Sequence, residues 1–140
     1  MRIKGGPLMG SKWIRSTGVH FIAGTYEPEK TRCIVETTKE GMAILDIGAH
    51  VGYFSLIMSR RAGSEGKVDA FEPRKLNRRF LKTHLRMNAA DNVRAHSQCV
   101  GDQVGRVKFE TRTGSGTGHV SNSGNTTVRM TTIDALSQSG

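Results

Sequence analysis

The chain has 140 residues, enough for one domain with a buried core and too few for two domains of ordinary size. Hydrophobic residues make up 36% and charged residues 24%, and no apolar run approaches the length of a membrane span, so we expect a cytoplasmic globular protein without membrane contact. The formal net charge of +9 favours contact with nucleic acid or an acidic ligand, although solubility alone would also explain it.

The two cysteines indicate neither a disulfide framework nor a metal site. Cys33 and Cys99 are far apart in the sequence and belong to no C-x-x-C pair. A single bridge between them stays open, but two reduced thiols are the better expectation for a cytoplasmic protein. We therefore predict no bound metal.

The N-terminal part predicts little regular structure before its first helix. Residues 1–26 carry scattered apolar positions among glycines and basic residues, which indicates a loosely packed lead-in. Within it, residues 19–22 could form a short strand. The pattern becomes helical over residues 26–40, where Pro28 suits the first helical turn.

The rest of the chain is organised around residues 43–61. The short apolar run 43–47 predicts a buried strand, Gly48 and Gly52 form a glycine turn, and residues 51–61 predict a buried helix. A strand, a glycine-rich turn and a helix bring backbone N–H groups and a helix N-terminus up to a ligand. The spacing D-x-G-x-x-x-G differs from the dinucleotide fingerprint and from the phosphate-binding loop.

Two further strand segments follow, separated by an amphipathic helix. Residues 67–72 alternate and stop at Pro73, residues 74–89 have the clearest helical period in the chain, and residues 93–100 predict a third strand. The helix places on one arc Leu76, Phe80, Leu81, His84, Leu85, Met87 and Asn88, and on the other Arg74, Lys75, Arg78, Arg79, Lys82 and Arg86. The order β-α-β-α-β predicts an α/β fold with a parallel sheet and right-handed crossovers.

The C-terminal pattern is different. Residues 106–110 and 127–131 alternate, and the polar, glycine-rich stretch 113–125 lies between them, which predicts a β-ribbon with a long flexible loop. Residues 132–136 predict the start of another helix, with Thr132 or Asp134 near its cap. The whole chain is predicted to be a single, partial domain.

Three strand ends carry the groups that a nucleoside cofactor needs. Asp46 ends the first strand, Glu72 the second, and Asp102 follows the third. In a doubly wound fold the ligand lies outside the carboxyl ends of the strands, where Glu72 could accept from ribose hydroxyls and Asp102 from an adenine amino group. Each residue alone has an ordinary structural explanation as a turn or strand-end residue, but three at successive strand ends favour a cofactor site.

These residues, in this order, are similar to the FkbM family of S-adenosylmethionine-dependent methyltransferases. The resemblance rests on the segments 46–55, 70–73 and 100–102, on Asn77, Asn88 and Asn92, and on residues 24–28 and 130–136. It implies a class I, Rossmann-like methyltransferase sheet with S-adenosylmethionine as cofactor. The implied activity is O-methylation of a small molecule or sugar.

The resemblance also implies roles for the site residues. Asp46, Gly48 and Gly52 would line the methionine end of the cofactor, Glu72 would bind the ribose, and Asp102 would lie near the adenine. Tyr26 and Glu27 would close over the methionine moiety. His50 stands where the family often has Asn, and would either hydrogen-bond the cofactor or stabilise its own loop. No catalytic base can be named.

The sequence departs from the family at its C-terminus. After a segment like residues 132–136 the family continues into a fourth strand with an acidic motif, which this chain lacks. The sheet is therefore predicted to stop after its third parallel strand, which leaves residues 43–47 as an edge. Such a chain is expected to form a homodimer, to bind a partner that completes the sheet, or to be a fragment of a longer protein or the product of a truncated gene. We favour the fragment or truncated gene and do not expect turnover by the chain alone.

Two other functions were weighed. The basic arc of the helix over residues 74–86 could contact phosphates, which would make the chain a nucleic-acid- or partner-binding module on a degenerate half-domain. That arc lacks the aromatic residues that stack bases in single-strand binders, so it is not favoured. The hypothesis of an NAD-dependent oxidoreductase is weakened because the dinucleotide fingerprint is missing.

We interpret His84, in the apolar arc of the helix over residues 74–89, as a core histidine.

Overall fold

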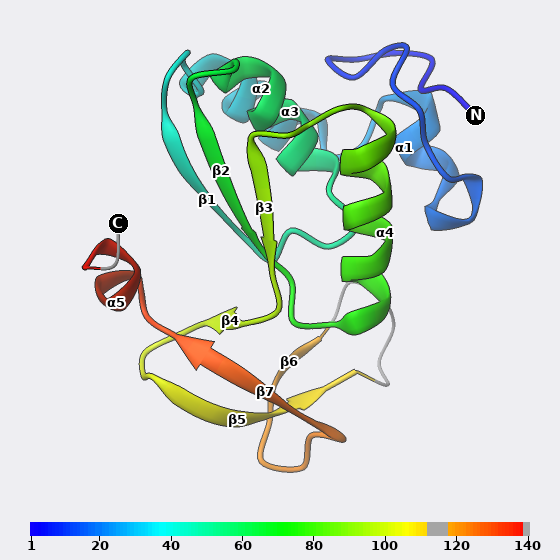
Figure 1. Ribbon diagram of the computed structural model, residues 1–140. Helices are drawn as coiled ribbons and strands as arrows, with labels where there is room; N and C mark the ends of the chain where they lie inside the picture. The colour runs from blue at the N-terminus through cyan, green and yellow to red at the C-terminus, as the bar shows by residue number, and fades with distance from the viewer. Residues whose placement is uncertain (112–117, 139–140) are drawn as a thin grey trace.

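The computed structural model describes residues 1–111 and 118–138, which form an α/β structure with two small sheets (Figure 1). After a short 3-10 turn at Arg15–Thr17, the elements are α1 (Val19–Ala23), α2 (Pro28–Thr37), β1 (Ala43–Ile47), α3 (Tyr53–Ala62), β2 (Lys67–Phe71), α4 (Lys75–Met87), β3 (Val93–His96), β4 (Cys99–Val100), β5 (Gly105–Glu110), β6 (His119–Val120), β7 (Thr126–Thr131) and α5 (Ile133–Ser137). Within the described residues, none of the helices is both long enough and apolar enough to cross a membrane.

The first sheet confirms the predicted β-α-β-α-β order. Its three strands are parallel in the order β1-β2-β3, with Asp46 beside Ala70 and Ala70 beside Ala95. Helix α3 contacts β1 and β2, helix α4 contacts β3, and α2 packs on α3 (Figure 1). The fold is therefore a Rossmann-like parallel sheet that stops after its third strand.

The edge position of β1 is confirmed, but its full burial is not. Asp46 faces the helices and is buried, whereas Leu45 is 39% and Ile47 is 49% exposed. In a strand, successive side chains point to opposite faces, so Leu45 and Ile47 share the face that α3 and α4 leave open. The prediction of a buried strand over residues 43–47 is therefore wrong for the face that carries Leu45 and Ile47.

The predicted third strand over residues 93–100 is also wrong in its second half. The chain leaves the parallel sheet after His96, and Cys99–Val100 form β4, which pairs in parallel with β7 in the second sheet. The apolar alternation stops at Ser97, and apolar residues resume at Cys99 and Val100. Such a pattern indicates that residues can form strands, but it does not show which sheet each strand joins.

The second sheet contains the predicted β-ribbon, formed by β5 and β7, and the two short strands β4 and β6. Its order is β4-β7-β5-β6, and β5 and β7 are antiparallel with Val107 opposite Val128. The flexible loop predicted at 113–125 is interrupted by β6, which pairs with Phe109 and Glu110 of β5. Residues 113–117 of that prediction lie outside the described residues. Helix α5 begins as predicted, with the Thr132 side chain accepting from the Ala135 backbone N–H.

The prediction of a loosely packed N-terminal lead-in is wrong. Ile3, Leu8, Trp13 and Phe21 are almost fully buried and belong to the same core cluster as α3 and α4. Residues 19–22 lie in helix α1 rather than in a strand. The apolar residues of this segment follow no helical or strand period, so sequence periodicity gave no sign that they pack into the core.

Helix α4 joins the N-terminal segment to the rest of the core. Its inner face is as predicted at Leu81, His84 and Leu85, but Leu76 is 51% exposed. The His84 ring stacks on Trp13 with their centroids 3.7 Å apart. The Ile14 backbone N–H donates to His84 Nε2 at 3.2 Å, and the other ring nitrogen lies 2.8 Å from the Val51 carbonyl oxygen. His84 is thus a core histidine with both ring nitrogens bonded.

Candidate functional site

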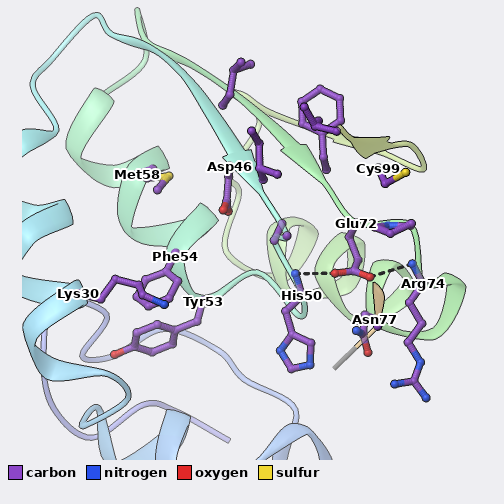
Figure 2. A pocket seen from close by; sticks show the side chains of 18 of the residues that line it. Lys30, Asp46, His50, Tyr53, Phe54, Met58, Glu72, Arg74, Asn77 and Cys99 are labelled. Atoms are coloured by element: carbon purple, nitrogen blue, oxygen red, sulfur yellow. Dashed lines mark hydrogen bonds between the residues drawn. The ribbon is translucent and has the colours of Figure 1, made fainter. Parts of the chain in front are cut away.

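A pocket of about 650 Å³ lies at the carboxyl ends of β1 and β2, where the sequence predicted a ligand. This volume falls in the range of roughly 300–1,000 Å³ that small-molecule sites occupy. Figure 2 shows Lys30, Tyr53 and Phe54 on one side of the pocket and Glu72, Arg74 and Asn77 on the other, with Asp46 between them.

Glu72 is the most firmly held side chain of the pocket. It is 6% exposed, its Oε2 accepts from the His50 backbone N–H at 2.9 Å, and its Oε1 accepts from the Arg74 backbone N–H at 2.8 Å. Burial raises the pKa of its carboxyl, and these two amide hydrogen bonds partly offset the rise. A carboxylate has about four acceptor positions, so Glu72 can still accept from a ligand while both of its oxygens are fixed.

The glycine turn presents bare backbone to the pocket at one glycine only. Gly48 lines the pocket with φ of 82°, and a side chain at its Cα would meet nothing within 4 Å. Gly52, with φ of 92°, lies outside the lining residues, and a Cβ there would come within 2.5 Å of Leu81 Cδ1. Gly48 therefore leaves room for a ligand, whereas Gly52 lets α4 pack against the turn.

Asp46 lies in the pocket wall and is tied to helix α3. Its Oδ2 accepts from the Ser55 hydroxyl at 2.5 Å, and the residue is buried. Burial raises the pKa of its carboxyl, and the hydrogen bond from Ser55 partly offsets that rise. The bond fixes the strand end relative to the first turn of the helix that follows it.

Two buried polar atoms beside the pocket lack a partner within the described chain. His50 Nε2 and the Tyr53 hydroxyl are buried and make no hydrogen bond there, and both residues line the pocket. Burial, together with the positive charges of Arg74 and His20, lowers the pKa of His50, and burial raises the pKa of Tyr53. Both groups are thus kept neutral near pH 7. An unsatisfied buried polar group costs about 1–3 kcal/mol, so these two atoms point to a ligand with polar groups.

Tyr26 and Glu27 form part of the wall before helix α2. The Tyr26 ring lies 4.4 Å from Phe21 and 5.5 Å from Tyr53, centroid to centroid. Burial and then the hydrogen bond to Glu27 raise the pKa of Tyr26 to about 12. The Glu27 carboxylate forms an ion pair with Lys30. Hydrogen bonds to Lys30 and Tyr26 lower the pKa of Glu27. Tyr26 and Glu27, both predicted as site residues, line the pocket.

Asp102 is not brought to the pocket. It is exposed, it follows β4 of the second sheet, and it is absent from the pocket lining. The lining instead includes Cys99, Val100 and Phe109 of the second sheet, which sequence reasoning missed. No motif or period marks these residues, because they reach the pocket only through the bend after β3. No group of acidic, histidine or cysteine residues in the described ranges could hold a metal ion.

Comparison with known proteins gives partial structural likenesses only. No family model matches the chain, and no curated protein does. An S-adenosylmethionine-dependent O-methyltransferase from Thermotoga maritima is 26% identical at a TM-score of 0.48, over 51% of this chain and 28% of that one. A protein-L-isoaspartate O-methyltransferase is 27% identical at a TM-score of 0.47, over 52% and 23%.

A third solved structure is fibrillarin from Aeropyrum pernix with natively bound S-adenosylmethionine. It is 29% identical at a TM-score of 0.39, over 42% of this chain and 25% of that one. The matched part of the chain thus spans only 23–28% of these three proteins. At TM-scores this low, the likenesses by themselves show neither a family nor a function for the chain.

Proposed function

We propose that the pocket binds S-adenosylmethionine and that the chain is the cofactor-binding part of a methyltransferase of the FkbM type, acting by O-methylation on a small molecule or sugar. The observation that carries the proposal is Glu72. Its carboxylate is buried at the end of β2 and held by two backbone amides on the wall of a pocket of suitable volume. The three solved structures named above are consistent with the proposal but do not carry it.

The lining residues fit the parts of this cofactor. Glu72 would accept from the ribose hydroxyls, and the bare backbone at Gly48 would admit the amino-acid moiety. His50 Nε2 and the Tyr53 hydroxyl would gain the hydrogen-bond partners that they lack. The aromatic surface of Tyr26 and the second-sheet residue Phe109 supply apolar walls.

The chemistry of the cofactor is the transfer of a methyl group already activated by sulfonium. Such a transfer needs the donor held in line with the nucleophile, and this orientation is the main contribution of the protein. The part that this chain would play is therefore to fix the donor: Glu72 and the Asp46–Ser55 bond hold two strand ends rigidly against the pocket. The proposal assigns no residue of the chain to deprotonation of the acceptor.

Titration calorimetry tests the proposal. We expect S-adenosylhomocysteine and S-adenosylmethionine to bind, and NAD to bind more weakly. Glu72→Gln should weaken S-adenosylhomocysteine binding by about 10-fold or more, because a hydrogen bond to a charged group contributes about 1.5–3 kcal/mol. Glu36→Gln, an exposed site on α2 outside the pocket, is the matched control and should bind as the unchanged chain does. Tighter binding of NAD would overturn the proposal.

A further inference from the structure

A second cleft is lined by residues of the N-terminal turn of α4 and of strands β5 and β7, and its charge is one-sided. Figure 1 shows β5 and β7 below the N-terminal end of α4. Its volume is about 510 Å³. No Asp or Glu is among its described lining residues, whereas five cationic residues line it: Arg74, Lys75, Arg78, Arg106 and Arg129. The predicted basic arc of α4 is thus divided, because Arg79, Lys82 and Arg86 of the same helix remain outside the cleft.

The fold places two of these cations directly opposite each other. Arg106 on β5 is the cross-strand partner of Arg129 on β7 in the antiparallel register. Like charges at such positions destabilise an antiparallel pair. Since none of the described lining residues is a carboxylate that could separate the two guanidinium groups, an anion bound there would relieve their repulsion.

Helix α4 adds to the positive potential of the cleft. Its first turn contains no acidic residue, and the cap residue Arg74 makes no side-chain cap hydrogen bond. The N-terminal end of a helix carries a partial positive charge. The Arg78 guanidinium is held in place here, since its Nη1 donates to the Glu72 carbonyl oxygen at 2.7 Å and to the Pro73 carbonyl oxygen at 3.0 Å.

We propose that this cleft binds the phosphate or diphosphate group of a small molecule. Arginine matches phosphate through paired N–H donors, and Ser97, Thr126 and Thr127 supply hydroxyl groups to the same cleft. None of the described lining residues is aromatic, so the base stacking that single-stranded nucleic acid uses is missing there. A cleft with phosphate donors and no stacking surface among these residues fits a small phosphorylated molecule better than a nucleic acid strand.

The cleft adjoins the cofactor pocket without depending on it. Pro73 and Arg74 line both cavities, so Arg74 contributes its backbone N–H to Glu72 on one side and belongs to the cation cluster on the other. The inference rests on the residues that line this cleft and on the N-terminal end of α4, and on nothing bound in the cofactor pocket. It would stand if S-adenosylhomocysteine failed to bind.

Calorimetry at constant ionic strength and neutral pH, with pyrophosphate and then glucose 1-phosphate as ligands, tests the inference. Arg106→Ala/Arg129→Ala removes two cleft charges, and Lys82→Ala/Arg86→Ala removes two exposed charges from α4 outside the cleft as the matched control. We expect pyrophosphate to bind the first variant at least about 10-fold more weakly and the control less than about 2-fold more weakly. Glucose 1-phosphate shows whether a monoester suffices or a diphosphate is needed.

Thermal unfolding provides the second readout. Because the cleft variant loses a like-charge pair, its unfolding midpoint without ligand should equal or exceed that of the unchanged chain. Pyrophosphate should raise the midpoint of the unchanged chain and of the control but not that of the cleft variant. No pyrophosphate binding, equal loss in both variants, or binding of a single-stranded RNA that both variants weaken equally would overturn the inference in favour of a diffuse basic surface.

Discussion

The two sheets of the molecule differ in what stabilises them. The parallel sheet packs against α3, α4 and the N-terminal segment, and its core cluster combines residues from all of these elements. The buried apolar residues of the second sheet, Cys99, Phe109 and Met130, stand outside that cluster. The parallel half therefore supplies most of the apolar burial, while the second sheet contributes walls to both cavities. Stability and ligand contact are thus divided unequally between the two sheets.

The largest effect should come from the residue that ties the N-terminal segment to the parallel half. Trp13 is 1% exposed and contacts Phe21, Tyr53 and His84. Trp13→Ala should lower the free energy of unfolding by about 3–5 kcal/mol, because it leaves a large cavity. Denaturant unfolding measures this loss. As a comparison, Val128→Ala at a half-buried position of β7 should lower the free energy of unfolding by less than about 1.5 kcal/mol. Equal losses from the two substitutions would contradict the statement that the parallel half supplies most of the apolar burial.

The two glycines of the first turn should differ when each is replaced by alanine. Both have positive φ, so each substitution carries a backbone strain of about 1–2 kcal/mol. Gly52→Ala adds a clash with Leu81, and overpacking costs about 1–3 kcal/mol more. Gly48→Ala adds no clash, but its methyl group enters the pocket and should weaken S-adenosylhomocysteine binding. Denaturant unfolding of the two variants measures the packing cost, and calorimetric titration with S-adenosylhomocysteine measures the loss of ligand binding. Equal destabilisation by Gly48→Ala and Gly52→Ala would contradict the packing role of Gly52.

The contact between His84 and the N-terminal segment should depend on pH. Burial lowers the pKa of His84 below its ordinary value of 6.5, and its bond to Val51 only partly offsets this. The stabilising effect of neutral His84 is fully present above pH 6.5 and is lost as pH falls through the lower folded pKa. Unfolding free energies measured from pH 7 to pH 5 should fall further in the unchanged chain than in His84→Gln. Identical pH profiles would contradict this role.

The smallest change in stability is expected at the open edge of the parallel sheet. Leu45 and Ile47 are exposed there, and the expectation that β1 pairs with a second copy or a partner strand stays a prediction. Leu45→Lys/Ile47→Lys should change the unfolding free energy by only about 0.5 kcal/mol, as for other surface sites. Size-exclusion chromatography with light scattering should show association of the unchanged chain and less of it in the variant. A monomer that is stable to dilution and concentration would contradict self-pairing.

Local patterns predicted the elements that have their own period or cap. Strands β1 and β2, helices α2, α3 and α4, the β5–β7 ribbon and the Thr132 cap of α5 all lie where the sequence placed them, within a few residues. The pocket also lies at the predicted strand ends and contains six of the eight predicted site residues: Tyr26, Glu27, Asp46, Gly48, His50 and Glu72. Asp46, Gly48, His50 and Glu72 lie there because the carboxyl end of a parallel strand and the turn after it have a constant place in the fold. Tyr26 and Glu27 were expected from the family resemblance, and the cofactor-binding roles of all six residues stay predictions.

The remaining predictions depended on contacts between distant residues. Asp102 was assigned to the site from its position after a third strand, but the chain bends into the second sheet before reaching it. Gly52 has the positive φ of a turn glycine, yet only its approach to Leu81 shows that the position serves packing. Neither outcome has a local signature in the sequence.

The sequence by itself determined the parallel β-α-β-α-β order and the acidic strand end at Glu72. These follow from hydrophobic period, glycine and proline positions and chain order, which act over a few residues. Only the tertiary structure decided that residues 1–26 are part of the core and that Arg106 faces Arg129 across the second sheet. Burial and strand register are set by residues far apart in the chain, so no local pattern determines them.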